Sequence, residues 1–142
     1  MIVPDVNLFI YALNERAMVH KKAKLWLESI FSGSETIGLS WNVLLAFVRL
    51  STRPGMFVHP LPVDTAFNQI DEWLEQPMSV VMHPGPRHAR ILRELLQPLG
   101  TAGNLTSDAH LAALAIEHGS QLCSADSDFA RFPGLKWTNP LA

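Results

Sequence analysis

The sequence has little cysteine, no excess of positive charge and no long apolar run. Cys123 is the only cysteine, so no disulfide can form within the chain, and we expect a reducing, cytoplasmic location. The 11 basic and 13 acidic side chains give a net charge of −2, which excludes a general positive field that would attract a polyanion. A nucleic acid would therefore have to be attracted locally, or through bound metal cations.

Signals for export, membrane insertion and several common sites are also absent. No run of about 18 apolar residues could span a bilayer, and no cationic leader precedes the first apolar residues, so we expect neither insertion nor export. The chain has no Gly-rich phosphate loop and no zinc-type spacing of Cys and His. Its 142 residues are 48% hydrophobic and 17% charged, which is typical of a globular protein, and we expect one domain over residues 1–142.

Strand-like and helix-like segments alternate along the chain. Short strands are predicted at 2–3, 36–39, 79–82 and 121–124, and helices from about residue 7, at 20–31, at 41–51, from 64 or 65 to 76, after the prolines at 84 and 86, and from 105 to the glycine at 119. Pro4 cannot donate to a sheet, which predicts that the first strand stops there or pairs on one side only. The alternation predicts an α/β fold with a mostly parallel sheet and helices on both faces.

Four aspartates lie where such a fold would bring them together. Asp5 follows the first predicted strand directly, and Asp126 and Asp128 follow the last one. Asp108 lies just inside a predicted helix, where the helix dipole tolerates a negative charge. Because ligand sites of open α/β sheets form at the carboxyl ends of the strands, we expect these acids to gather at one edge.

A cluster of carboxylates has two possible explanations. Hard cations such as Mg²⁺ and Mn²⁺ prefer carboxylate oxygens, and a bound cation can activate water and offset the charge that builds up during phosphodiester cleavage. However, aspartate is also common at helix caps and turns, so any one of these residues could have a purely structural role. Asp5 could cap the helix that follows it, and Asp126 with Asp128 could form a turn.

Four segments, spread over nearly the whole chain, also carry a family resemblance. They are Asp5-Val6-Asn7, Leu44-Leu45-Ala46-Phe47-Val48-Arg49, Asp108-Ala109-His110-Leu111-Ala112-Ala113-Leu114-Ala115 and Ser124-Ala125-Asp126-Ser127-Asp128-Phe129. In this order they resemble the PIN-domain ribonucleases, and more narrowly the VapC toxins of type II toxin–antitoxin modules. The resemblance implies a PIN-like three-layer α/β/α fold with a short central sheet. It also implies a homodimeric endoribonuclease that depends on Mg²⁺ or Mn²⁺ and is inhibited by a VapB-like antitoxin.

The same resemblance assigns roles to individual residues. The catalytic and metal-binding acids that it implies are Asp5, Asp108 and Asp126, with Asp128 as a further metal ligand. Three other side chains are expected to support the site. Asn7 and Ser124 would do so close to the acids, while Arg49 would reach a phosphate or a structural carboxylate.

One departure from the family pattern concerns Ala46. The family usually has a glutamate three residues before the arginine, and alanine cannot ligate a metal. The site therefore either works with the remaining aspartates and water, or has become a PIN-like module that binds antitoxin or RNA without cutting. A phosphoryl-transfer or receiver domain is a third alternative, disfavoured because none of the four lysines, at 21, 22, 24 and 136, lies after a late strand and before the acidic motif.

Other polar and aromatic residues are expected to have ordinary roles. His110 follows Asp108 by two positions on a helix, so it should face away from that acid, toward solvent or a partner. The arginines at 87, 90 and 93 are expected to form a solvated helix face rather than an RNA track, and the four tryptophans are expected mostly in the core.

Overall fold

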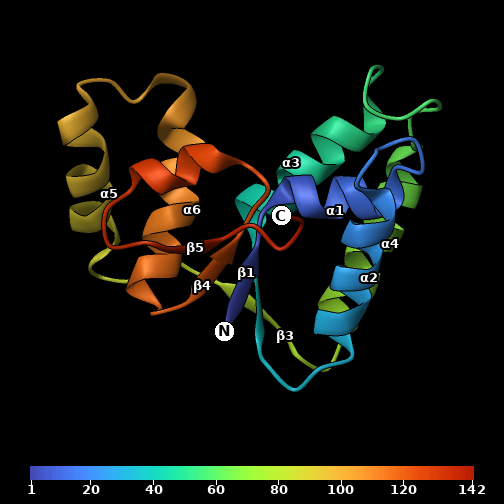
Figure 1. Ribbon diagram of the computed structural model, residues 1–142, viewed down its shortest axis with the longest axis horizontal. Helices are drawn as coiled ribbons and strands as arrows, with labels where there is room; N and C mark the ends of the chain where they lie inside the picture. Colours follow the sequence, from blue (N-terminus) through green and yellow to red (C-terminus); the bar gives the residue numbers. More distant parts are fainter.

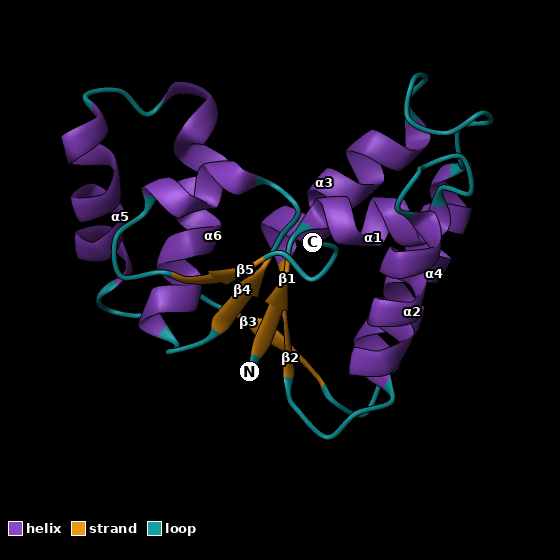
Figure 2. Cartoon of the chain, viewed as in Figure 1, coloured by secondary structure: helices purple, strands orange, loops and turns teal.

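A central sheet of five strands organises the molecule. The computed structural model describes residues 1–142, and in it the strands are β1 (Ile2–Pro4), β2 (Ile37–Ser40), β3 (Ser79–Met82), β4 (Gln121–Cys123) and β5 (Lys136–Thr138). They lie in the order β3-β2-β1-β4-β5, and every neighbouring pair is parallel. All strands therefore run in the same direction and end at the same edge of the sheet (Figure 2, strands in orange).

Helices cover both faces of this sheet, so the predicted three-layer α/β/α fold is confirmed. The helices are α1 (Val6–Leu13), α2 (His20–Phe31), α3 (Trp41–Thr52), α4 (Val63–Glu75), α5 (His88–Leu96) and α6 (Thr106–Glu117). In Figure 1, α1 to α4 lie on one side of the sheet and α5 and α6 on the other. Short 3₁₀ turns occur at Gln97–Leu99, Gly103–Leu105 and Ser127–Arg131. No helix is both long and apolar enough to cross a bilayer.

Pro4 limits how β1 pairs, as its missing N–H predicts. On the β4 side, β1 pairs along its whole length, and Pro4 is opposite Cys123. On the β2 side, only Ile2 has a partner, Ile37. The next amide, that of Asp5, then donates to the carbonyl of Cys123 at 2.9 Å. This bond fixes the backbone of Asp5 beside the end of β4.

The core is a single cluster of 30 buried apolar residues. On the face covered by α1, α3 and α4, the ring centroid of Trp73 lies 4.3 Å from that of Phe9 and 4.8 Å from that of Phe47. On the other face, α6 buries Ala109 and the five consecutive residues from Leu111 to Ala115, because the helix is enclosed between the sheet and α5. Of the four tryptophans, Trp73 is buried, Trp26 and Trp137 are half-buried and pack against the core, and Trp41 is 42% exposed, so the expectation holds for three of the four.

The ends of several elements differ from the predictions. Helix α4 begins at Val63 after Pro62, so neither Asp64 nor Thr65 is its cap. Strand β5 was not predicted, because its three residues contain one apolar side chain and show no alternating pattern. It is held by parallel pairing to β4, which is a long-range contact that a local pattern cannot reveal.

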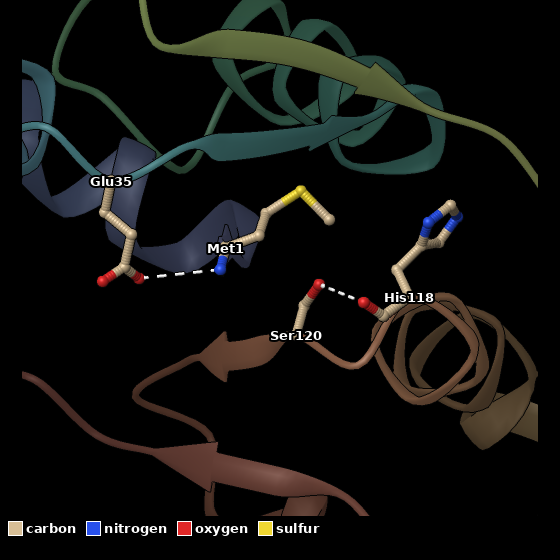
Figure 3. Close-up of polar contacts among 4 residues, drawn as sticks. All are labelled: Met1, Glu35, His118 and Ser120. Carbon is tan, nitrogen blue, oxygen red and sulfur yellow. Dashed lines mark hydrogen bonds and ion pairs between the residues drawn. The ribbon is translucent and has the colours of Figure 1, made fainter.

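Two polar contacts at the amino edge of the sheet are weak. The amino group of Met1 lies 3.8 Å from the carboxylate of Glu35, and the hydroxyl of Ser120 donates to the carbonyl of His118 at 3.4 Å (Figure 3). The Glu35 side chain is 58% exposed, so this ion pair contributes little to stability. The polar cluster of the molecule therefore lies at the opposite, carboxyl edge.

The aromatic contacts around Trp73 give a stability prediction. Phe47→Ala should lower the free energy of unfolding by about 3–5 kcal/mol, because it removes a fully buried ring and leaves a cavity. Phe67→Ala is the matched control, since Phe67 on α4 is 39% exposed, and it should cost less than about 1 kcal/mol. Urea unfolding followed by circular dichroism measures both. Equal costs for the two variants would contradict this description of the core.

Candidate active site at the carboxyl edge of the sheet

Asp5 is buried at the junction of β1 and α1, and both of its carboxylate oxygens have hydrogen-bond donors. The amide of Val6 donates to Oδ1 at 2.7 Å, and the hydroxyl of Ser124 donates to Oδ2 at 2.8 Å. Burial raises the pKa of Asp5 above its ordinary value, and the nearby charge of Asp126 raises it further, whereas the two hydrogen bonds lower it. Asp5 is therefore a helix cap and, at the same time, a carboxylate held in place by β4.

The Ser124 hydroxyl connects three segments of this edge. Besides donating to Asp5, it accepts from the Nδ2 of Asn7 at 3.1 Å and from the amide of Asp126 at 3.0 Å. A hydroxyl has one hydrogen and two lone pairs, so Ser124, which is fully buried, uses its whole bonding capacity. The indole N–H of Trp137, from β5, donates to the Ser124 carbonyl at 3.1 Å. The predicted neighbours Asn7 and Ser124 thus do lie beside Asp5, whereas the contact of Trp137 was not predicted.

Asp126 and Asp128 form the turn that their spacing suggested. The Oδ1 of Asp126 accepts from the amide of Asp128 at 2.9 Å and caps the short 3₁₀ helix Ser127–Arg131. Asp128 lies 3.6 Å from Arg131, and because both side chains are about half exposed, this pair adds little stability. The turn holds both carboxylates next to the Ser124 hydroxyl network.

Asp108 faces these acids from the first turn of α6. The pKa of Asp108 is raised to about 6, first by burial and then by the charges of Asp5, Asp126 and Asp128. Burial alone would raise this pKa, and the further contributions of the other three aspartates indicate that their charges lie near it. The structure therefore brings together all four aspartates, from β1, α6 and the segment after β4, as the parallel sheet predicted.

A small cavity of about 130 Å³ opens between α3 and α6 at this edge. Asp5 and Asp108 line it on one side, and the α3 residues Asn42, Ala46 and Arg49 line it on the other. Position 46 therefore does face the acids, and the alanine leaves a gap there in the ring of charged oxygens. Arg49 is the only basic side chain that lines this cavity.

Larger hollows of about 430 and 400 Å³ lie elsewhere, beside α1 and α4. Neither is lined by any of the four aspartates. Both open beside the far end of α1, at Leu13, and not at its start next to Asp5, so their size does not make them the site of chemistry. A docked partner would suit them better than a reacting phosphate.

The donor set suits a hard divalent cation, but it does not enclose one. Carboxylate oxygens are the donors that Mg²⁺ and Mn²⁺ prefer, and a bound cation would relieve the repulsion that contributes to the raised pKa of Asp108. No three His, Cys, Asp or Glu side chains stand close enough together to hold an ion among them. The charged ligands are thus gathered at one edge and still open, which is consistent with the missing carboxylate at Ala46.

His110 is half-buried and contacts a residue of α5, whereas the expectation was that it faces solvent or a partner. Its Nδ1 lies 2.9 Å from the Nε2 of His88 on α5, and the two rings meet edge to face. Burial and the neighbouring His88 lower the pKa of His110. The arginines at 87, 90 and 93 are exposed, as predicted. His88 was not singled out from the sequence, because its partner comes from a different helix.

Comparison with known proteins identifies the class and then the family. Residues 2–135 match the family model of the PIN domain. Ribonuclease VapC37 of Mycobacterium tuberculosis is 46% identical over 142 residues, which cover all of this chain and 99% of the relative. Ribonuclease VapC33 of the same species is 43% identical over 141 residues, which cover 99% of each. The chain is a PIN-domain protein. It belongs to the VapC ribonuclease family.

Solved structures share the fold at lower sequence identity. VapBC2 from Rickettsia felis, bound to a DNA fragment from its promoter, matches with a TM-score of 0.70 and 22% identity, over 98% of both chains. VapC20 of Mycobacterium tuberculosis, a toxin that cleaves the sarcin–ricin loop, matches with a TM-score of 0.63 and 19% identity, over 96% of this chain and 99% of that one. The receiver-domain alternative is therefore wrong.

The raised pKa of Asp108 predicts a pH-dependent gain in stability for Asp108→Asn. Folding raises this pKa from 3.8 to about 6, so the charged form is disfavoured in the folded state, and stability falls as pH rises through this range. Without divalent metal, Asp108→Asn should be more stable than the wild type near pH 7.5 by about 1 kcal/mol, a value reduced because the half-exposed side chain is screened by solvent.

The gain should vanish below about pH 4, where the wild-type carboxyl is protonated in both states. Asp64→Asn, in the first turn of α4, is the matched control and should give no gain, because Asp64 is an exposed acid at a helix N-terminus. Urea unfolding at both pH values measures the difference. A gain for Asp108→Asn that is the same at both values would show that charge repulsion is not its cause.

Proposed function

We propose that this protein is a divalent-metal-dependent endoribonuclease, the toxin of a VapBC-type toxin–antitoxin module. The observation that carries the proposal is the convergence of Asp5, Asp108, Asp126 and Asp128, seen in the raised pKa of Asp108. The full-length relatives that are named ribonucleases support it. The whole chain, residues 1–142, would act as a single catalytic domain.

In this function, Asp5, Asp108 and Asp126 would hold Mg²⁺ or Mn²⁺, with Asp128 as a further ligand. When bound, such an ion lowers the pKa of a water and offsets the negative charge that develops on the phosphate. The Ser124 hydroxyl and the Val6 amide orient the Asp5 carboxylate and favour its charged form. Asn7 in turn orients Ser124, which is the supporting role that the sequence suggested.

Arg49 is proposed to contact the RNA. It is exposed, lines the cavity beside Asp108 and forms no ion pair. A guanidinium in this position can donate two hydrogen bonds to a phosphate at the edge of the acid cluster. Because the whole chain has a net charge of −2, such a local cation would help to place a polyanion there.

The partners are proposed to be RNA, a second copy of the chain and a VapB-like antitoxin. Two of the similar solved structures are VapBC assemblies, from Rickettsia felis and Haemophilus influenzae. The acid cluster favours an antitoxin that places an arginine against the carboxylates, since a guanidinium pairs well with a desolvated carboxylate. The hollows beside α1 and α4, with the exposed Val58 and Phe67 nearby, would suit the rest of that partner.

A PIN-like module that binds without cutting is the alternative, and Ala46 is its main support. The high identity to ribonucleases over the full length weighs against it. The remaining aspartates still provide three or four charged oxygen donors at one edge, which is enough to hold one ion completed by water. We therefore favour an enzyme with weak metal affinity over an inactive module.

Cleavage of RNA tests the proposed function directly. The wild type, incubated with total RNA and Mn²⁺, should produce new ends, and a chelator should abolish them. Asp108→Asn should lower the rate by about 100-fold or more, because altering residues that merely orient a metal ligand already costs roughly 10–100-fold. This variant is expected to be more stable than the wild type, so lost activity cannot be attributed to unfolding. Asp64→Asn should cleave normally, whereas cleavage that persists in chelator would refute the metal-dependent mechanism.

A further inference from the structure

An open polar hollow lies where α5 ends and the chain turns back toward α6. Its volume is about 350 Å³, and its polar lining comes from Arg93, Gln97 and Thr101. Gly100 makes the turn in the left-handed backbone conformation, with a φ of 73°, and its amide donates to the carbonyl of Gln97 at 3.1 Å. This turn brings Thr101 to the same hollow as the last turn of α5.

The cationic and amide side chains here are exposed and have no partner within the protein. Arg90, Arg93 and Gln97 follow each other at intervals of three and four residues, so they share one face of α5 and of the turn that continues it. None of the three forms an ion pair or a side-chain hydrogen bond. Arg87 differs, because it donates to the carbonyl of Glu117 at 2.7 Å and so has a structural contact.

This part of the surface is locally positive, although the protein as a whole is not. From residue 76 to residue 107 the chain has three arginines and a single acid, Glu94, whereas its net charge is −2. No acidic side chain lines the hollow. The hollow therefore suits an anion better than a cation or an apolar group.

The hollow lies on the same side of the molecule as the acid cluster. In Figure 1, the end of α5 and the start of α6 both lie at the side toward which the strands point. Thr101 precedes Asp108 by seven residues, three of which form the 3₁₀ turn Gly103–Leu105. With the usual rises per residue, the Cα atoms of Thr101 and Asp108 are at most about 16 Å apart. Stacked nucleotides advance by about 3.4 Å each, so roughly five of them span this distance.

Charge and position favour RNA as the occupant. As the proposed substrate, RNA must approach four aspartates on a protein of negative net charge, so cations beside the acids have to supply the attraction. Arg49 is such a cation on the α3 side. Arg131 already lies 3.6 Å from Asp128, and Arg93 is the next cation along the chain from Asp108. A guanidinium can donate two parallel hydrogen bonds to one phosphate.

We propose that this hollow is a second contact for RNA, which binds phosphates away from the cleaved bond through Arg90 and Arg93. This inference rests on the proposed function, since it assigns a further contact to the RNA of that nuclease. Phosphates carry no sequence information, so the contact would set the affinity and the path of the strand rather than the choice of bases. It would not require metal, because its donors are cations and amides rather than carboxylates.

Binding of a labelled RNA in chelator tests the proposal without relying on cleavage. The probe is a short, fluorescein-labelled single-stranded RNA of mixed sequence, and fluorescence anisotropy at several salt concentrations gives its affinity. Arg93→Gln should weaken binding about tenfold at low salt, because a charge-assisted hydrogen bond is lost. The slope of log K against log salt should become shallower by about 0.7, and by about 1.4 in the double variant Arg90→Gln with Arg93→Gln.

Two further variants separate lost charge at this site from general effects. Arg93→Lys keeps the charge and should keep the salt slope of the wild type. Lys22→Gln is the matched control, because it removes an exposed cation from α2 on the other side of the sheet, and it should change neither affinity nor slope. Urea unfolding checks that each variant is folded.

Competition by polyglutamate distinguishes RNA from an acidic protein partner. Unlabelled RNA should displace the probe at a lower concentration of charge than polyglutamate, since Gln97 and Thr101 can also form hydrogen bonds to the sugars. Equal displacement at equal charge would assign the hollow to polyanions in general, acidic proteins among them, and would overturn the assignment to RNA.

The outcomes also separate this inference from the proposed function. Wild-type affinity and slope in the double variant, or no binding by the wild type at low salt, would overturn the contact at α5. Metal-dependent cleavage by the wild type would then leave the nuclease proposal standing. RNA binding that depends on these arginines, without any cleavage in Mn²⁺, would instead overturn the nuclease and keep the contact.

Discussion

Repulsion among carboxylates at one edge of the sheet is the constraint on which the rest of this site depends. Parallel strands end at the same edge of a sheet, so the residues that follow them are brought close even when their charges repel each other. Here, burial first and then the charges of Asp5, Asp126 and Asp128 raise the pKa of Asp108 to about 6. Directed hydrogen bonds hold the carboxylates of Asp5 and Asp126, and Arg131 lies 3.6 Å from that of Asp128. The buried hydroxyl of Ser124 is central, because it donates to Asp5 and accepts from the backbone of Asp126.

In these aspartates the observed structural role is compatible with the proposed chemical one. Asp5 caps α1 through one oxygen and is held by Ser124 through the other, and Asp126 caps a 3₁₀ helix next to the same hydroxyl. A capping carboxylate accepts hydrogen bonds from nearby backbone amides, which restricts the orientations of its side chain. Preorganised carboxylates bind a cation with less loss of side-chain entropy. The sequence left open whether these aspartates are structural caps or metal ligands. The two roles are compatible, because a capping carboxylate is already held in place.

Much of this arrangement could be predicted from local sequence, and the rest depended on contacts between distant segments. Helix α2 and strand β3 have the predicted bounds, because their apolar spacing is regular. The acids were found because each one directly follows a strand or opens a helix. Strand β5 and the pair of His88 with His110 were missed, since each is defined by a partner far away in sequence. The position of Asn42 opposite Asp108 likewise requires knowing that α3 and α6 face one cavity.

Proton release on metal binding is the most direct test of the claim that these acids form one metal site. A cation must displace the proton of Asp108, whose pKa is about 6. Mn²⁺ titrations in two buffers of different ionisation enthalpy should show release of most of a proton at about pH 5.5 and almost none at about pH 8. The release should disappear in Asp108→Asn. Mn²⁺ binding with no proton release at the lower pH would contradict the claim, because the ion would then be bound away from this carboxylate.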